Sequence, residues 1–175
     1  MLAIPVFLIL LTDLRYREAL AVFVAAGITD ALDGAIARLT HTKTTLGAYL
    51  DPAADKLLLM SAFVALAFMQ VVPTWLTVIV LSRDVMLVVG YFLLFTMTQH
   101  AMEVKPSAIG KLSTFLQICS VTLVLVSLVQ WNHVPATATS ICFLLTGLVT
   151  ASAGLQYMVR GLRWLQRQLG GTAPG

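Results

Sequence analysis

The sequence predicts an all-α integral membrane protein, a six-transmembrane-helix bundle in which the first helix is truncated. Of its 175 residues, 59% are hydrophobic and 11% are charged, whereas an average soluble domain has about 25% charged residues. Five of the eight acidic residues lie inside apolar segments. This composition also excludes a disordered chain, because disordered chains are polar and highly charged. The length predicts a single domain over residues 1–175, with a disordered tail at 170–175.

Six apolar segments predict the helices, because a membrane-spanning helix needs about 20 mostly apolar residues. The first segment is too short to span a membrane alone, and we expect it to be the second half of a longer helix. The connections are short, and the longest one joins the fourth and fifth segments. The segments are 1–12, 19–38, 46–69, 72–98, 112–131 and 134–158.

The positions of Lys and Arg predict how the chain is oriented in the lipid bilayer. With an even number of spans, seven basic residues fall on one side and only Arg15 and Arg17 on the other. Because cytoplasmic loops carry the excess of Lys and Arg, we expect both termini on the cytoplasmic side, in a bacterial inner membrane. The basic residues form no stripe of the kind that binds nucleic acid, so no nucleic-acid partner is expected.

Four acidic residues form a pattern in the second and third segments. Asp30 and Asp33 are three positions apart, and Asp51 and Asp55 are four apart, so each pair lies on one face of its helix. Consecutive helices with a short connection are antiparallel neighbours, which brings both pairs to one depth near the cytoplasmic face. Such a group of oxygen ligands favours two divalent cations, Mg²⁺ or Mn²⁺. A two-metal carboxylate site is suited to phosphoryl transfer.

Small residues and one arginine share the helix faces of these acids. Gly34, Ala37 and Arg38 follow the first pair, and Gly47 lies one turn before the second. Small residues allow a ligand to approach the backbone closely, and a guanidinium binds a diphosphate through two hydrogen bonds. Taken singly, the small residues are equally typical of ordinary helix packing.

Together these positions resemble the signature of the CDP-alcohol phosphotransferases, in the string Asp30-x2-Asp33-Gly34-x2-Ala37-Arg38-x8-Gly47-x3-Asp51-x3-Asp55. All eight signature positions are filled, and the resemblance extends over the chain as six helices. It implies an enzyme that transfers a phosphatidyl group from CDP-diacylglycerol to an alcohol acceptor and releases CMP. It also implies a homodimer within the membrane.

The resemblance implies a role for each signature position. Asp30, Asp33 and Asp51 match metal ligands, and Asp55 completes the metal site. Asp55 also matches the general base for the acceptor hydroxyl, which makes it the candidate catalytic residue. The positions that match those around the CDP moiety are Asp33, Gly34, Ala37, Arg38 and Gly47.

Later segments bear on the acceptor, for which two alternatives stay open. The run Gly110-Lys111-x2-Thr114-x2-Gln117 resembles phosphatidylglycerophosphate synthases and CMP-forming cardiolipin synthases. Their acceptors, glycerol 3-phosphate and phosphatidylglycerol, both carry a phosphate. The stretches 82–87 and 150–153 are more similar to the cardiolipin synthases. The expected basic pocket for the acceptor phosphate consists of Arg83, Lys105 and Lys111.

An ion- or proton-coupled transporter is the alternative function, because intramembrane carboxylates also mark ion pathways. Such transporters commonly contain repeated halves with broken helices, whereas the four patterned acids lie in a single helical hairpin. A catalytically inactive family member is disfavoured, because no signature position is missing. The chain departs from the family pattern at its N-terminus, where Met1 lies inside the expected first helix.

Overall fold

The computed structural model describes residues 3–40, 45–98, 107–129 and 135–170, and these residues form six α-helices and no β-strand. Residues 171–175, which make up most of the predicted tail, lie outside the described residues. The helices are α1 (Ala3–Thr12), α2 (Tyr16–Thr40), α3 (Thr45–Phe68), α4 (Thr74–Thr98), α5 (Ala108–Leu128) and α6 (Ala136–Gly170).

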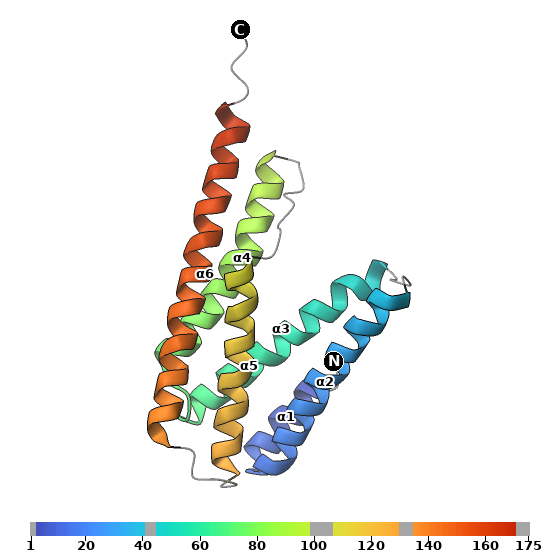
Figure 1. The fold of residues 1–175 in the computed structure, drawn as a ribbon, viewed down its shortest axis with the longest axis vertical. Helices are drawn as coiled ribbons and strands as arrows, with labels where there is room; N and C mark the ends of the chain where they lie inside the picture. Colours follow the sequence, from blue (N-terminus) through green and yellow to red (C-terminus); the bar gives the residue numbers. More distant parts are fainter. Residues whose placement is uncertain (1–2, 41–44, 99–106, 130–134, 171–175) are drawn as a thin grey trace.

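The helices form two groups that cross each other (Figure 1). Helices α4, α5 and α6 make up one group, in which α6 packs against both α4 and α5. Helices α1, α2 and α3 make up the other, and α5 joins the groups because it also contacts α2 and α3. The last turns of α4 and α6 lie toward the top of Figure 1, and the last turn of α2 lies on the right at about mid-height.

Tight turns set the ends of several helices. Leu14, between α1 and α2, and Gln70, after α3, have left-handed backbones with φ of 58° and 60°. A left-handed residue ends a helix and reverses the chain. Pro73 and Pro135 directly precede α4 and α6. Proline suits a helix start, because the missing N–H would have no partner within the helix there.

The apolar core lies where α1, α3 and α5 meet. Phe7 and Leu11 of α1, Phe63 and Leu66 of α3 and Leu125 of α5 are completely buried. The short helix α1 therefore packs against the C-terminal half of α3. The first turns of α3, which carry part of the signature, lie away from α1.

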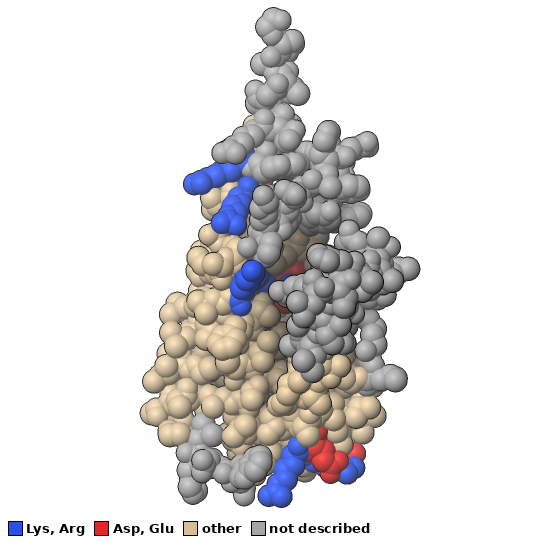
Figure 2. Space-filling view, turned by 45° about the vertical axis from the view of Figure 1, so that its right-hand side comes forward, with Lys and Arg blue, Asp and Glu red and all other residues tan. Residues whose placement is uncertain are grey.

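The outer surface is also strongly apolar. Phe68 is 83% exposed and Leu148 is 68% exposed, and many other large apolar side chains face outward. Figure 2 shows the described charged side chains at the lower end, near the upper end and in a small group at mid-height, with an uncharged surface elsewhere on this face. Two helices among the described residues, over Ala108–Leu128 and Ala136–Arg163, are long and apolar enough to cross a membrane. An apolar surface of this extent is typical of a protein embedded in lipid.

The helices match the predicted segments in number and order, and most ends agree within three residues, but two ends differ by more. Helix α5 begins at Ala108 instead of 112, because Ser107 caps it: the Ser107 hydroxyl accepts a 3.0 Å hydrogen bond from the Gly110 N–H. Lys111 therefore lies in the first turn of α5 and not in the connection before it. Helix α6 continues to Gly170 instead of ending at 158, since the polar residues in this stretch include good helix formers.

A matched pair of glycines tests the packing of α4 against α6. A Cβ at Gly147 would lie 2.6 Å from Trp75 Cζ3, whereas a Cβ at Gly90 would meet no described atom within 4 Å. We expect Gly147→Ala to lower the Tm in detergent, because overpacking costs about 1–3 kcal/mol. Gly90→Ala should leave the Tm unchanged or raise it, since Ala is better in a helix than Gly by about 1 kcal/mol. Equal shifts in the two variants would contradict this packing.

Candidate active site

The eight signature positions lie on two adjoining helices. Side chains of residues 30–55 lie outside the described part of the structure, so the predicted contacts among them remain predictions. The positions in the last three turns of α2 are Asp30, Asp33, Gly34, Ala37 and Arg38. Those in the first three turns of α3 are Gly47, Asp51 and Asp55.

Both acidic pairs lie at one level of the bundle. Asp30 lies ten positions before the last residue of α2, and Asp55 lies ten positions after the first residue of α3. At 1.5 Å per residue, each is about 15 Å from the end of its helix. Helices α2 and α3 contact each other, and only residues 41–44 separate them in the chain (Figure 1). The two backbones therefore bring the acidic positions to the same part of the molecule.

The residue types at this level fit a divalent cation. Four aspartates at one level of two adjoining helices supply only oxygen ligands, which Mg²⁺ and Mn²⁺ prefer. Outside residues 30–55, the described side chains include no group of three or more His, Cys, Asp or Glu that could hold a metal. The α2–α3 hairpin, whose acidic side chains lie outside the described residues, remains the metal centre predicted from the sequence.

A charged cluster begins at the residue after Asp55, with a half-buried lysine and two buried partners. Lys56 Nζ lies 3.0 Å from Asp84 Oδ1, and Arg83 Nη1 lies 2.7 Å from the same oxygen. Arg83 and Asp84 are only 7% and 3% exposed. This three-residue cluster, Lys56, Arg83 and Asp84, ties the signature helix α3 to the middle of α4.

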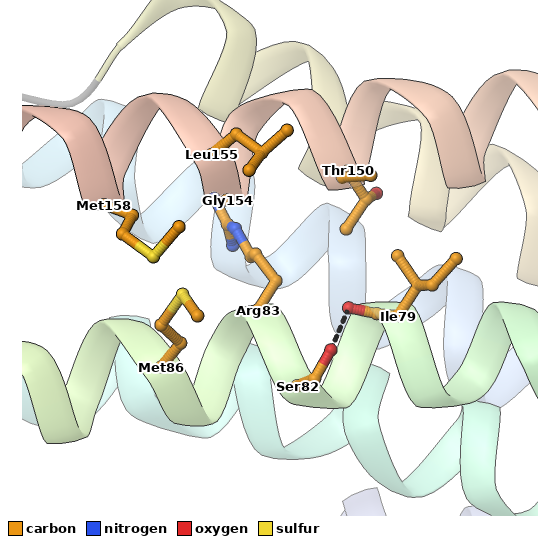
Figure 3. A pocket seen from close by; sticks show the side chains of 9 residues that line it. Ile79, Ser82, Arg83, Met86, Thr150, Gly154, Leu155 and Met158 are labelled. Carbon is orange, nitrogen blue, oxygen red and sulfur yellow. Dashed lines mark hydrogen bonds between the residues drawn. The ribbon is translucent and has the colours of Figure 1, made fainter.

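Arg83 extends from α4 toward α6, beside Gly154 (Figure 3). Its guanidinium carbon lies 5.7 Å from the centre of the Tyr157 ring, a cation–π distance. A Cβ at Gly154 would lie 3.6 Å from Arg83 Cγ, so the arginine stem runs close to the α6 backbone. Arg83 Nε is buried and has no hydrogen-bond partner among the described atoms.

An apolar pocket of about 190 Å³ lies between α4 and α6, with lining residues on both sides of Arg83 (Figure 3). Ile79, Met86 and Met158 line it, with the stem of Arg83 as part of the wall. Ser82 offers no free donor there, because its hydroxyl donates a 3.1 Å hydrogen bond to the Ile79 carbonyl. The chemistry of this region therefore depends on the guanidinium of Arg83.

Tyr157 connects this region to the beginning of α5. Its hydroxyl oxygen accepts a 3.2 Å hydrogen bond from the Ser107 N–H. Gly110 approaches the same hydroxyl so closely that a Cβ would lie 2.8 Å from it. The N-terminal turn of α5 is thus held against one edge of Tyr157, and Arg83 lies over the ring.

The predicted acceptor-phosphate residues have three different positions. Arg83 lies in the interior of the bundle, Lys111 is exposed on the first turn of α5, and Lys105 lies outside the described residues. No role for Lys56 or Tyr157 is predicted from the sequence. A lone lysine in an apolar segment was the available signal for Lys56, because such a charge needs a partner inside the bundle.

Other residues of the predicted acceptor motif join α5 to α6. Ser113 and Thr150 share a 2.8 Å hydrogen bond between their hydroxyls. The Gln117 amide donates to both oxygens, at 3.2 and 3.3 Å. All three residues are buried, and their polar groups bind one another, so they hold these two helices in register.

Comparison with known proteins decides the family. The family model for CDP-alcohol phosphatidyltransferases matches residues 1–153. The chain belongs to the CDP-alcohol phosphatidyltransferase family. The match covers both helices of the signature, the charged cluster and the start of α5.

Curated relatives carry two kinds of name. CMP-forming cardiolipin synthases of Rattus norvegicus and Homo sapiens are each 32% identical to this chain over 177 residues, which is 93% of the chain and 58% of either relative. A probable phosphatidylglycerophosphate synthase of Mycobacterium tuberculosis is 34% identical over 145 residues, 83% of the chain and 66% of the relative. The chain thus spans less than two thirds of the length of these relatives.

The α5–α6 contact gives a prediction about stability in this phosphatidyltransferase-family chain. Thr150→Val removes the hydroxyl that Ser113 and Gln117 contact. The loss should cost about 0.5–2 kcal/mol, because buried polar groups lose a partner. Thr122→Val is the control, since the Thr122 hydroxyl only donates to the Ile118 carbonyl of its own helix. Thermal unfolding in detergent measures both, and equal Tm values for the two variants would contradict the assignment.

Proposed function

We propose that the protein transfers a phosphatidyl group from CDP-diacylglycerol to an alcohol acceptor and releases CMP, in glycerophospholipid synthesis. The observation that carries the proposal is the complete signature, placed at one level of two adjoining helices in a chain of this family. Family membership also favours transfer chemistry over the transporter alternative.

The proposed setting is a bundle of six helices that passes through the membrane repeatedly. The apolar outer surface supports this arrangement. The excess of Lys and Arg on one side supports a cytoplasmic location for both termini and for the signature end of α2 and α3. We further propose a bacterial inner membrane and a homodimer, both from the family resemblance.

The signature aspartates would hold two divalent cations, Mg²⁺ or Mn²⁺, through Asp30, Asp33, Asp51 and Asp55. When bound, such ions neutralise the charge of a diphosphate and of the departing phosphate. Arg38 would bind the diphosphate directly, and Gly34, Ala37 and Gly47 would leave room for the nucleotide beside the backbone.

In the proposed reaction Asp55 accepts the proton of the acceptor hydroxyl. The hydroxyl oxygen then forms a bond to the lipid-bearing phosphorus, and the bond from that phosphorus to the CMP oxygen breaks. The products are CMP and the acceptor carrying the phosphatidyl group. The residues position the two reactants for in-line attack and exclude competing water.

Two phosphate-bearing acceptors fit the proposal: glycerol 3-phosphate and phosphatidylglycerol. The names of the relatives include both synthase types. Arg83 is the described residue best placed to meet a phosphate, because it is buried and retains an unpartnered N–H. Lys105 and Lys111 complete the proposed basic pocket.

The experiment that tests this proposal measures CMP release by the purified protein in detergent or liposomes. CDP-diacylglycerol is supplied with Mg²⁺ or Mn²⁺, and each acceptor is offered separately. We expect release with one acceptor, complete loss with EDTA and recovery when the cation is restored. Release that is unaffected by EDTA would contradict the metal centre, and no release with either acceptor would contradict the proposed reaction.

A single substitution tests the proposed base. Asp55→Asn should lower CMP release by at least about 100-fold, because general base catalysis contributes about 10²–10⁴-fold. Asp13→Asn is the matched control, since Asp13 is exposed in the turn between α1 and α2 and lies far along the chain from the signature. Full activity of Asp55→Asn would remove this residue as the base.

A further inference from the structure

The charged cluster of Lys56, Arg83 and Asp84 contains two cations and one carboxylate. Within the described side chains it therefore carries one excess positive charge. Arg83 and Asp84 are buried, whereas the Lys56 side chain is 37% exposed. An anion that reaches the cluster from the Arg83 side is attracted by this excess positive charge. Arg83 Nε is buried and has no acceptor among the described residues. A buried donor without an acceptor is costly, so an anion that accepts from this N–H would also be stabilised.

Asp84 controls where the Arg83 guanidinium lies. One oxygen, Oδ1, is 2.7 Å from Arg83 Nη1 and 3.0 Å from Lys56 Nζ. With Nη1 occupied by Asp84, the Nε–H remains without an acceptor among the described residues. The ring of Tyr157 limits the guanidinium on its other side, at 5.7 Å from Arg83 Cζ.

The cluster also follows the signature directly, since Lys56 is the next residue after Asp55. Asp84 of α4 binds the Lys56 ammonium of α3. This contact fixes the cluster to α3, the helix that carries the second acidic pair. An anion bound at Arg83 would therefore have a defined place relative to α3.

We propose that Asp84 is a positioning residue for the acceptor. It holds Arg83 so that the free Nε–H donates to an anionic phosphate oxygen of the acceptor, and the Tyr157 ring supports the same orientation. This inference rests on the proposed function. The shared chemistry is a phosphate next to an alcohol, which is a monoester in glycerol 3-phosphate and a diester in phosphatidylglycerol.

A purely structural ion pair between α3 and α4 would have different consequences. Loss of such a pair would lower the Tm and the amount of active protein, with no preference between substrates. Loss of a positioning residue raises the KM for the acceptor alone, because CDP-diacylglycerol is bound through the signature.

The experiment measures CMP release by the full chain while one substrate is varied and the other is saturating. The variants are Asp84→Asn, which keeps the shape and removes the charge, and Asp84→Glu, which keeps the charge. The control is Glu18→Gln, because Glu18 pairs with Arg15 at an exposed site. Glycerol 3-phosphate and phosphatidylglycerol are offered in separate arms, so the arm in which the KM changes identifies the phosphate that Arg83 binds.

We expect Asp84→Asn to raise the KM for the acceptor by about tenfold or more, the effect of losing one charged hydrogen bond. The KM for CDP-diacylglycerol should stay within about twofold, Asp84→Glu should recover most of the loss, and Glu18→Gln should match the unmodified protein. Equal changes in both KM values, or a fall in kcat with both KM values unchanged, would overturn the positioning role.

A second variant decides the question if Asp84→Asn does not fold. Tyr157→Leu removes both the ring that faces Arg83 and the hydroxyl that accepts from the Ser107 N–H, whereas Tyr157→Phe keeps the ring and removes only the hydroxyl. Tyr157→Leu should raise the acceptor KM by about threefold or more relative to Tyr157→Phe, because only the leucine variant loses the cation–π contact. Equal acceptor KM values in these two variants would overturn the inference while leaving the proposed function standing. Absence of CMP release by the unmodified protein would overturn both.

Discussion

The arrangement of the bundle depends on how a few charges are accommodated inside an apolar protein. The carboxylate of Asp84 binds Lys56 and Arg83 through one oxygen and so connects α3, α4 and, through Tyr157, α6. Without it, the buried guanidinium of Arg83 would be left without its carboxylate partner, which is far more costly than the loss of an exposed ion pair. The Arg15–Glu18 pair is such an exposed pair, and it stabilises little.

Hydroxyl and amide groups hold the other side of the molecule together. Ser113, Gln117 and Thr150 bind one another, and Ser120 and Thr146 form a second contact of 2.8 Å nearer the opposite end. Small polar side chains of this kind let membrane helices approach closely while every polar group keeps a partner. The rigid α5–α6 pair then supports Tyr157 beside Arg83, while the signature lies on the separate α2–α3 hairpin.

Much of this architecture follows from the sequence, and the failures have physical causes. Hydropathy predicts six helices in the correct order, but it misses the start of α5, because Ser107 and Gly110 form a local cap that apolarity does not report. It also ends α6 too early, since helix formation continues into the polar stretch after 158. The Lys56–Asp84 pair was missed because the partners lie on different helices and only packing brings them together. The pattern of four aspartates predicts a divalent-cation site, whereas the role of each signature position came from the resemblance. The side chains of the signature lie outside the described part of the structure.

We propose that the α2–α3 hairpin holds the divalent cations that the transfer reaction uses. Anomalous X-ray scattering from crystals grown with Mn²⁺ and a CDP-linked lipid would locate these cations. We expect two manganese peaks between the last turns of α2 and the first turns of α3, and their loss in a crystal of Asp51→Asn. Manganese bound only elsewhere in the bundle, and none at this hairpin, would show that the hairpin is not the metal centre.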